Sequence, residues 1–355
     1  MIPILYERNE TEFRSNGLGR LRDCKSCRVT EVRNGIYECE FEYPVKGHNS
    51  DKIRYGRIIA AIHDESGDVQ PFDIVSSTKP IAGIVTWRAV HISYRQSKLV
   101  THGTNINTLA DAFARLTTKC FPTNPFEYET DKTGQGICGA FDGIPKSVKS
   151  VLGGVEGSIL DTYGGEYEFD KFSVRLWNAR GRDRDLTIRY GVNLVDYTDE
   201  TDYTDAYTEC LPYWTNGDDT VVALISTRPE GFPIIGYNGR RECMPMDLSG
   251  EFETQPSQDD LFAVAKAYMT RNEVNMPRQT LSVDFVRLQD SEEYAQYSKI
   301  MDCRLCDTVR VIFPQYNMTG RLKIVKAVYD VLLERYESME LGSLSTTLSE
   351  ALGIK

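Results

Sequence analysis

A chain of 355 residues with 41% hydrophobic and 26% charged residues has the composition of an ordinary globular protein, and its length favours two to four domains. Its net charge of −11 argues against a nucleic-acid surface, because binding phosphates requires a basic footprint. No apolar run approaches the roughly 20 residues of a membrane helix, and the N-terminus has no signal-peptide pattern, so we expect a soluble protein made in the cytoplasm. The nine cysteines are expected to be reduced, partly buried thiols.

The first hundred residues have the pattern of a β-structure. Asn34-Gly35 lies between two alternating runs and predicts a hairpin with a two-residue turn. The apolar residues of the run 37–43 alternate with glutamates, as in a half-buried strand. The two-residue turn would place Cys27 opposite Glu42 and Cys39 opposite Thr30. Further strands are predicted at 57–62, 70–76, 81–89 and 91–94.

The rest of the chain predicts separate blocks of helices and strands. Apolar residues at helical spacing predict helices over 105–120, capped by Asn107, over 143–165, ended by Gly164-Gly165, and over 257–272. The glycines inside the second helix indicate close packing or a break. Strands are predicted over 166–195, with a hairpin tip at 180–185, and at 220–226, 231–237, 277–288, 307–314, 320–331 and 336–341. This order indicates an α+β, β-rich fold and not the βαβ alternation of a parallel sheet.

Two CxxC pairs, Cys24/Cys27 and Cys303/Cys306, have a spacing found in zinc sites. About 275 residues separate the two pairs, whereas structural zinc sites draw their ligands from neighbouring loops. The predicted hairpin register points Cys27 and Cys39 to opposite faces, so they would not share a metal. A thioredoxin-like role is weaker still, because no helix follows either pair. We therefore predict no metal site and no cofactor.

The remaining polar features indicate no catalytic site. No motif joins a histidine to a serine or cysteine nucleophile, so ordinary surface or loop histidines are expected. The acidic run Asp196–Cys210 lacks the spacing of a calcium loop and is interpreted as a solvated acidic edge. The sequons at Asn9 and Asn317 carry no sign of secretion. The four histidines are His48, His63, His91 and His102.

Several stretches together resemble phage and prophage tail proteins of the minor structural, tail-endopeptidase type. A hairpin of the form T-E-x-x-N-G-x-Y-E-x-x-x-x-Y-P matches residues 30–44, and "LGGVEGSILDTYGGEYEFDKFSVRLWNARGRDRDLTIRYGVNL" is the most specific stretch. "QPFDIVSSTKP", "VHISYRQSKLV", "CDTVRV" and "YDVLLERYESMELG" are similar to further parts of that family. Cys306 stands where glycine is usual in it.

The resemblance covers nearly the whole chain and implies the baseplate-hub fold. It implies two β-barrel-like domains, at 1–100 and 186–342, the second with a helical insertion at about 257–300. An α/β domain at 101–185 and a C-terminal helix or tail at 343–355 complete the expected organisation.

The resemblance also implies a function. We expect a structural protein of the virion tail tip, a homotrimer that closes the tail tube and connects it to host-adhesion parts. Its expected partners are its own copies, the distal tail and tail-tip proteins, and the bacterial cell surface, without nucleic acid. The alternatives are a cell-wall endopeptidase and a carbohydrate-binding adhesin. The chain stops just past the hub, so we expect no enzymatic activity.

Overall fold

The computed structural model divides the chain into two compact units. Unit 1 contains Met1–Thr198 and Ser282–Leu341, and unit 2 contains Asp199–Leu281. No helix among the described residues is long and apolar enough to cross a membrane. The structure describes residues 1–78, 83–104, 106–155, 157–189, 196–204, 206–223, 226–230, 241–252, 254–271, 274–275, 278–284, 303–313 and 318–342.

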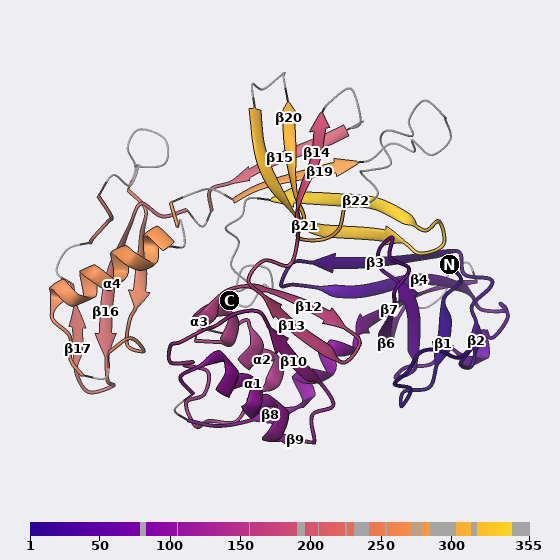
Figure 1. Ribbon diagram of the computed structural model, residues 1–355, viewed down its shortest axis with the longest axis horizontal. Coiled ribbons are helices and arrows are strands. Elements are labelled where there is room, and N and C mark those ends of the chain that lie inside the picture. The colour runs from indigo at the N-terminus through magenta and orange to yellow at the C-terminus, as the bar shows by residue number, and fades with distance from the viewer. Residues whose placement is uncertain are drawn as a thin grey trace. The chain divides into compact units, whose positions relative to one another are not determined.

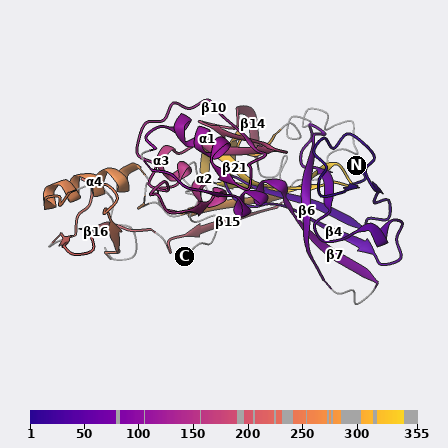
Figure 2. The same cartoon turned by 90° about the horizontal axis from the view of Figure 1, so that it is seen from below.

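A large, mostly antiparallel sheet forms the frame of unit 1 (Figure 1). From the middle outward its strands run β22-β21-β3-β4-β7-β6-β5-β1-β2, while β20 pairs with both β21 and β14. Figure 2 shows β4, β6 and β7 side by side in the part of the unit that carries the N-terminus. The strands are β1 Ile4–Tyr6, β2 Gly19–Arg20, β3 Ser26–Val32, β4 Tyr37–Pro44, β5 Ile58–Ile62, β6 Val69–Ser77, β7 Ile84–His91, β14 Asp183–Arg189, β20 Thr308–Phe313, β21 Met318–Asp330 and β22 Arg335–Gly342.

The sheet encloses a core because alternate residues of its strands are apolar. In β4 the buried residues alternate with half-buried and exposed ones, as the sequence predicts. The core includes Phe41, Tyr43, Phe72 and Tyr329, all almost fully buried. Two short 3₁₀ helices follow strands of this sheet: η1 Ser50–Lys52 lies between β4 and β5, and η2 Ile92–Lys98 leads from β7 into the next part of the chain.

Residues 99–178 of unit 1 have a core of their own and are called the helical lobe (lower part of Figure 1). Helices α1 Leu109–Thr118, α2 Val148–Leu152 and α3 Ile159–Tyr163 pack there with two small sheets. One sheet joins β8 Val100–Thr101 to β9 Cys120–Phe121 and β11 Lys146–Ser147, and the other joins β13 Ser173–Trp177 to β10 Glu127–Thr130 and β12 Glu166–Asp170.

The described residues of unit 2 form one helix and a three-stranded sheet. Helix α4, Gln258–Arg271, buries Leu261, Ala265 and Met269, which confirms the predicted apolar face. These residues pack with Trp214 of the sheet. The sheet consists of β16 Glu209–Thr215, β17 Thr220–Val222 and β18 Cys243–Asp247. Strands β15 Asp196–Asp202 and β19 Arg278–Asp284 each contain a boundary between the two units.

The fold confirms the α+β, β-rich class predicted from the sequence. The four-part domain division was not tested by this two-unit split and stays a prediction. The strand expected at 231–237, the sequon at Asn317 and the tail at 343–355 lie outside the described residues, as does most of the predicted insertion beyond α4.

The predicted hairpin register was wrong by one residue. Cys27 pairs with Phe41, and Val29 pairs with Cys39. The turn holds three residues, because the Val32 carbonyl accepts the Gly35 N–H and Asn34 has a φ of 54°. The slip places Cys27 and Cys39 on the same buried face, with their sulfur atoms 3.7 Å apart.

Three helix and strand predictions also need correction. Thr108, and not Asn107, caps α1, because its side chain accepts the Asp111 N–H at 3.1 Å. The predicted helix over 143–165 is broken into α2 and α3, and Gly154 and Gly157 between them have positive φ angles. The predicted strand at 91–94 is the start of η2, whose first turn is capped by the His91 side chain.

His91 is fully buried, and its hydrogen bonds fix its neutral form. Nδ1 accepts the Ser93 backbone N–H at 3.2 Å, and Nε2 lies 3.3 Å from Oε1 of Gln70, so the proton is on Nε2. The ring stacks on Tyr37 with 4.4 Å between centroids. Burial, assisted by nearby His63, lowers the pKa of His91 well below its ordinary 6.5.

This buried imidazole predicts an acid-sensitive stability. Below about pH 6.5 the unfolded chain binds a proton at this position and the folded chain does not, so the stability falls as the pH falls, by up to about 1.4 kcal/mol per pH unit. His91→Gln is expected to reduce the loss of stability between pH 7 and pH 5, measured from urea midpoints. Replacing the exposed His102 with Gln is the control and should leave the slope unchanged. Equal slopes in all three proteins would contradict this assignment.

Candidate functional site

The main buried polar feature of unit 1 is a cluster of five charged side chains, here called the junction. It joins the β3–β4 hairpin, the helical lobe and strand β21. Glu31, Arg33, Glu166 and Lys323 are each less than 10% exposed, and the Arg180 side chain is 13% exposed. Because a buried charge without a partner is very unfavourable, the arrangement depends on complete pairing.

Glu166, at the start of β12, is the centre of the junction. One carboxylate oxygen accepts a hydrogen bond from Lys323 Nζ at 2.5 Å and lies 3.4 Å from a guanidinium nitrogen of Arg33. The other oxygen accepts the Arg180 backbone N–H at 2.8 Å. One carboxylate therefore holds groups from three parts of the chain.

Arg180 forms the second half of the junction. Its guanidinium donates to Glu31 at 2.6 Å and to the Tyr167 carbonyl at 3.3 Å. Burial alone would lower the pKa of Arg180, but the Glu31 carboxylate overrides this effect and holds that pKa above its ordinary value. The residue stays a cation that pins the hairpin strand β3 to β12.

Further hydrogen bonds, one of them within an ion pair, extend the junction on both sides. The Asn34 amide donates to the Gly165 carbonyl at 2.9 Å and accepts the Tyr167 N–H at 2.8 Å. The Asp307 carboxylate accepts the Arg182 N–H at 2.8 Å and a guanidinium N–H of Arg184 at 2.6 Å. The turn between β3 and β4 and the start of β14 are thus hydrogen-bonded to residues more than a hundred positions away in the sequence.

The junction corrects the interpretation of residues 180–185 as a hairpin tip. Strands β13 and β14 do not pair with each other; β13 pairs with β10 and β12, and β14 pairs with β20. The segment between them crosses from the helical lobe to the main sheet. Backbone packing there is close, since a Cβ on Gly181 would overlap the carbonyl group of Cys306.

The two CxxC pairs do not form one cluster. Cys24 donates to the Ser26 carbonyl at 3.1 Å, and Cys27 lies beside Cys39. Cys306 lies near the junction, and burial raises its pKa to about 12. Within the described part of the chain, no group of three or more His, Cys, Asp or Glu side chains has the geometry to hold a metal. None of the nine cysteines forms a disulfide bond.

Cys306 has a φ of 72°, a region that favours glycine. At this position we expect Cys306→Gly to be more stable than Cys306→Ala by about 1 kcal/mol, because alanine keeps the left-handed strain. Cys39, buried within β4, is the matched control, and alanine should be the better replacement there. Urea unfolding of the four variants measures both differences. The same order at both positions would contradict strain at Cys306.

The other predicted residues have separate environments. His63 lies 3.8 Å from Asp64, His91 is buried as described, and His48 and His102 are exposed. The acidic run 196–210 is not wholly a solvated edge, since Glu209 is buried and pairs with Arg241. No contact of a histidine with an accessible cysteine or serine is present among the described residues.

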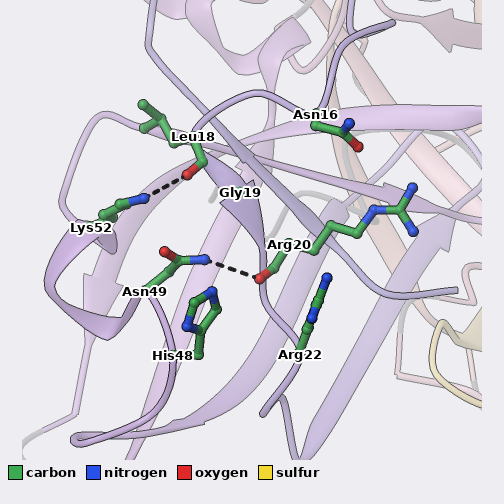
Figure 3. Close-up of a pocket in the computed structure, with 8 residues that line it drawn as sticks. All are labelled: Asn16, Leu18, Gly19, Arg20, Arg22, His48, Asn49 and Lys52. Atoms are coloured by element: carbon green, nitrogen blue, oxygen red, sulfur yellow. Dashed lines mark hydrogen bonds between the residues drawn. The ribbon is translucent and has the colours of Figure 1, made fainter.

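Unit 1 also has a surface pocket of about 550 Å³ (Figure 3). Arg20 and Arg22 line one side of it, and His48, Asn49 and Lys52 come from the segment between β4 and β5. Figure 3 shows Lys52 and Asn49 reaching the backbone carbonyls of Leu18 and Arg20. Its lining is therefore mostly basic and polar.

This architecture is the fold of prophage and phage tail proteins. The chain is similar to prophage tail protein gp18 from Listeria monocytogenes EGD-e, with a TM-score of 0.62 and 15% identity over 99% of this chain and 97% of that one. It is also similar to a tail protein from Neisseria meningitidis MC58, with a TM-score of 0.59 and 10% identity over 99% of both chains.

A third structure is the 43 kDa tail protein of prophage MuSo2 from Shewanella oneidensis. It has a TM-score of 0.58 and 8% identity over 99% of this chain and 100% of its own. No protein family and no curated protein matches the sequence. The likeness is therefore one of fold, and it confirms the tail-protein fold expected from the sequence resemblance.

Proposed function

We propose that this chain is a structural component of a phage or prophage tail tip. In this proposal it is a hub subunit that forms a homotrimer, closes the tail tube and connects it to the parts that attach to the host. The match to three tail proteins supports it, because the match extends over 99% of this chain and at least 97% of each of theirs. The partners would be two further copies and the neighbouring tail proteins.

The strand edges of unit 1 favour assembly with other copies. Among the described strands, β2 and β14 each pair on one side only. Such edges pair readily with another chain unless they are protected. A closed ring of identical subunits would cover them in every copy.

The proposal assigns no hydrolytic activity to the chain. The one histidine–serine hydrogen bond of the four histidines joins His91 and Ser93, which are both buried away from any substrate. A catalytic serine and its histidine base must both reach the substrate, and this buried pair cannot. A cell-wall clearing assay tests this part, and clearing that is lost on replacing a histidine or cysteine would overturn it.

The oligomeric state tests the hub. Light scattering of the purified chain over a range of concentrations should show a species of three times the 40.3 kDa chain mass. Electron microscopy of that species should show a three-fold ring. A chain that stays monomeric at its highest soluble concentration, and is missing from purified tail particles by mass spectrometry, would contradict the proposal.

A further inference from the structure

The basic pocket of Figure 3 carries an unneutralised positive charge on an acidic chain. The chain has 52 acidic and 41 basic residues, so carboxylate partners are abundant. Neither guanidinium, of Arg20 or of Arg22, forms a hydrogen bond or ion pair with any residue that the structure describes. Asp23, which does not line the pocket, accepts the His48 backbone N–H at 2.6 Å. The pocket thus presents cationic donors to solvent.

The pocket is built by buried and conformationally restricted residues. The hydroxyl of Tyr43, which is 1% exposed, donates to the His48 carbonyl at 2.5 Å and fixes that loop in place. Gly19 has a φ of 136°, and a Cβ there would lie 2.6 Å from the Asn49 amide nitrogen. Asn49, with a φ of 65°, donates to the Arg20 carbonyl at 3.3 Å. These contacts hold the loop in one arrangement before any ligand arrives.

The chemistry of the lining restricts the ligand. The one apolar side chain in the lining is Leu18, and the lining contains no Phe, Tyr or Trp, so a neutral sugar would lack the large stacking surface that those side chains provide. Guanidinium groups bind phosphate through pairs of parallel hydrogen bonds, and Lys52 keeps two N–H donors besides the one given to Leu18 at 2.9 Å. A volume of about 550 Å³ accommodates a small organic phosphate.

We propose that this pocket binds the phosphate group of a small phosphorylated polyol or sugar unit. Arg20, Arg22 and Lys52 would neutralise the phosphate, and Asn49 would contact a neighbouring hydroxyl. The site goes beyond the proposed hub function and does not depend on trimer formation. Its ligand is defined by charge and size, and not by a base or an aromatic group.

Isothermal titration of the full chain with glycerol 3-phosphate tests the site. Saturable binding is expected that weakens with added salt, and that glycerol, which lacks the phosphate, does not reproduce. The double variant Arg20→Gln/Arg22→Gln should bind at least about tenfold more weakly, because two charge-assisted contacts are lost. Arg14→Gln, an exposed arginine outside the pocket, should bind like the wild type.

Three results of the titrations with glycerol 3-phosphate and glycerol would overturn the site. They are no saturable binding by the wild type, equal weakening in Arg14→Gln, and equally tight binding of glycerol. A short DNA duplex that binds more tightly than glycerol 3-phosphate would also overturn it, since it would indicate a general polyanion surface. Gly19→Ala, which displaces Asn49, gives a second reduced-binding variant. Melting temperatures and light-scattering masses of all variants separate loss of the pocket from unfolding and from loss of assembly.

Discussion

Glu166→Gln is expected to destabilise unit 1 by about 3–5 kcal/mol, since removing one partner of a buried ion pair leaves the others uncompensated. The amide keeps the size of the side chain but not its charge, so Lys323 and Arg33 both lose the negative charge that they contact at this position. Urea unfolding followed by tryptophan fluorescence measures the effect, because Trp87 and Trp177 lie in unit 1.

A surface carboxylate of the same lobe provides the control. Glu129 pairs with Arg175 at 3.2 Å, and its side chain is 62% exposed. Glu129→Gln should cost less than about 1 kcal/mol, as exposed ion pairs do. A cost below about 1 kcal/mol for Glu166→Gln as well would show that the junction does not stabilise the fold.

Gly181→Ala should be similarly damaging for a steric reason. The new Cβ would lie far inside the 3.0 Å limit of real contacts, against the carbonyl carbon and oxygen of Cys306. Because backbone and not a flexible side chain blocks the space, β14 and β20 must move apart, at a cost of about 3 kcal/mol or more.

Chemical denaturation and hydrogen exchange of β14 and β20 measure this change. Gly250→Ala is the matched control, since a Cβ there meets nothing within 4 Å. An unchanged unfolding midpoint for Gly181→Ala would contradict the close approach of the two backbones.

The sequence predicted correctly those helices and strands whose buried face follows from the spacing of apolar residues within the element itself. The alternation in β4 and the apolar face of α4 depend on residues two to four positions apart, and both are confirmed. The α+β class follows from the order of such segments.

The turn of the first hairpin shows where local reasoning stopped. Asn34-Gly35 predicts a two-residue turn, but the Arg33 N–H donates to the Val325 carbonyl at 2.8 Å, and Asn34 bonds to Gly165 and Tyr167. Partners from distant segments shape the turn and shift the register. No property of residues 26–44 alone contains that information.

The junction was missed for the same reason, although all of its residues except Lys323 stand in the stretches that carried the family resemblance. Glu31 and Asn34 belong to the hairpin motif, Arg180 and Gly181 to the longest motif, and Cys306 to the "CDTVRV" motif. The charged residues of the longest motif were interpreted as belonging to a solvated turn. Only the fold brings them together, because the contacts of Glu166 reach 133 and 157 residues along the chain.

The pairing of β3 with β21 has a consequence for synthesis. The N-terminal amino group donates to the Val331 carbonyl at 2.6 Å, and β3 lies beside a strand made almost three hundred residues later. Until the ribosome has made β21, the edge of β3 lacks the strand that pairs with it, and the buried Glu166 lacks Lys323. Pairing between strands so far apart in the sequence is slow, and the partly folded intermediates are exposed to aggregation in the meantime. Nascent chains that end before β21 should therefore be sensitive to protease and bind chaperones, whereas the completed chain should resist both.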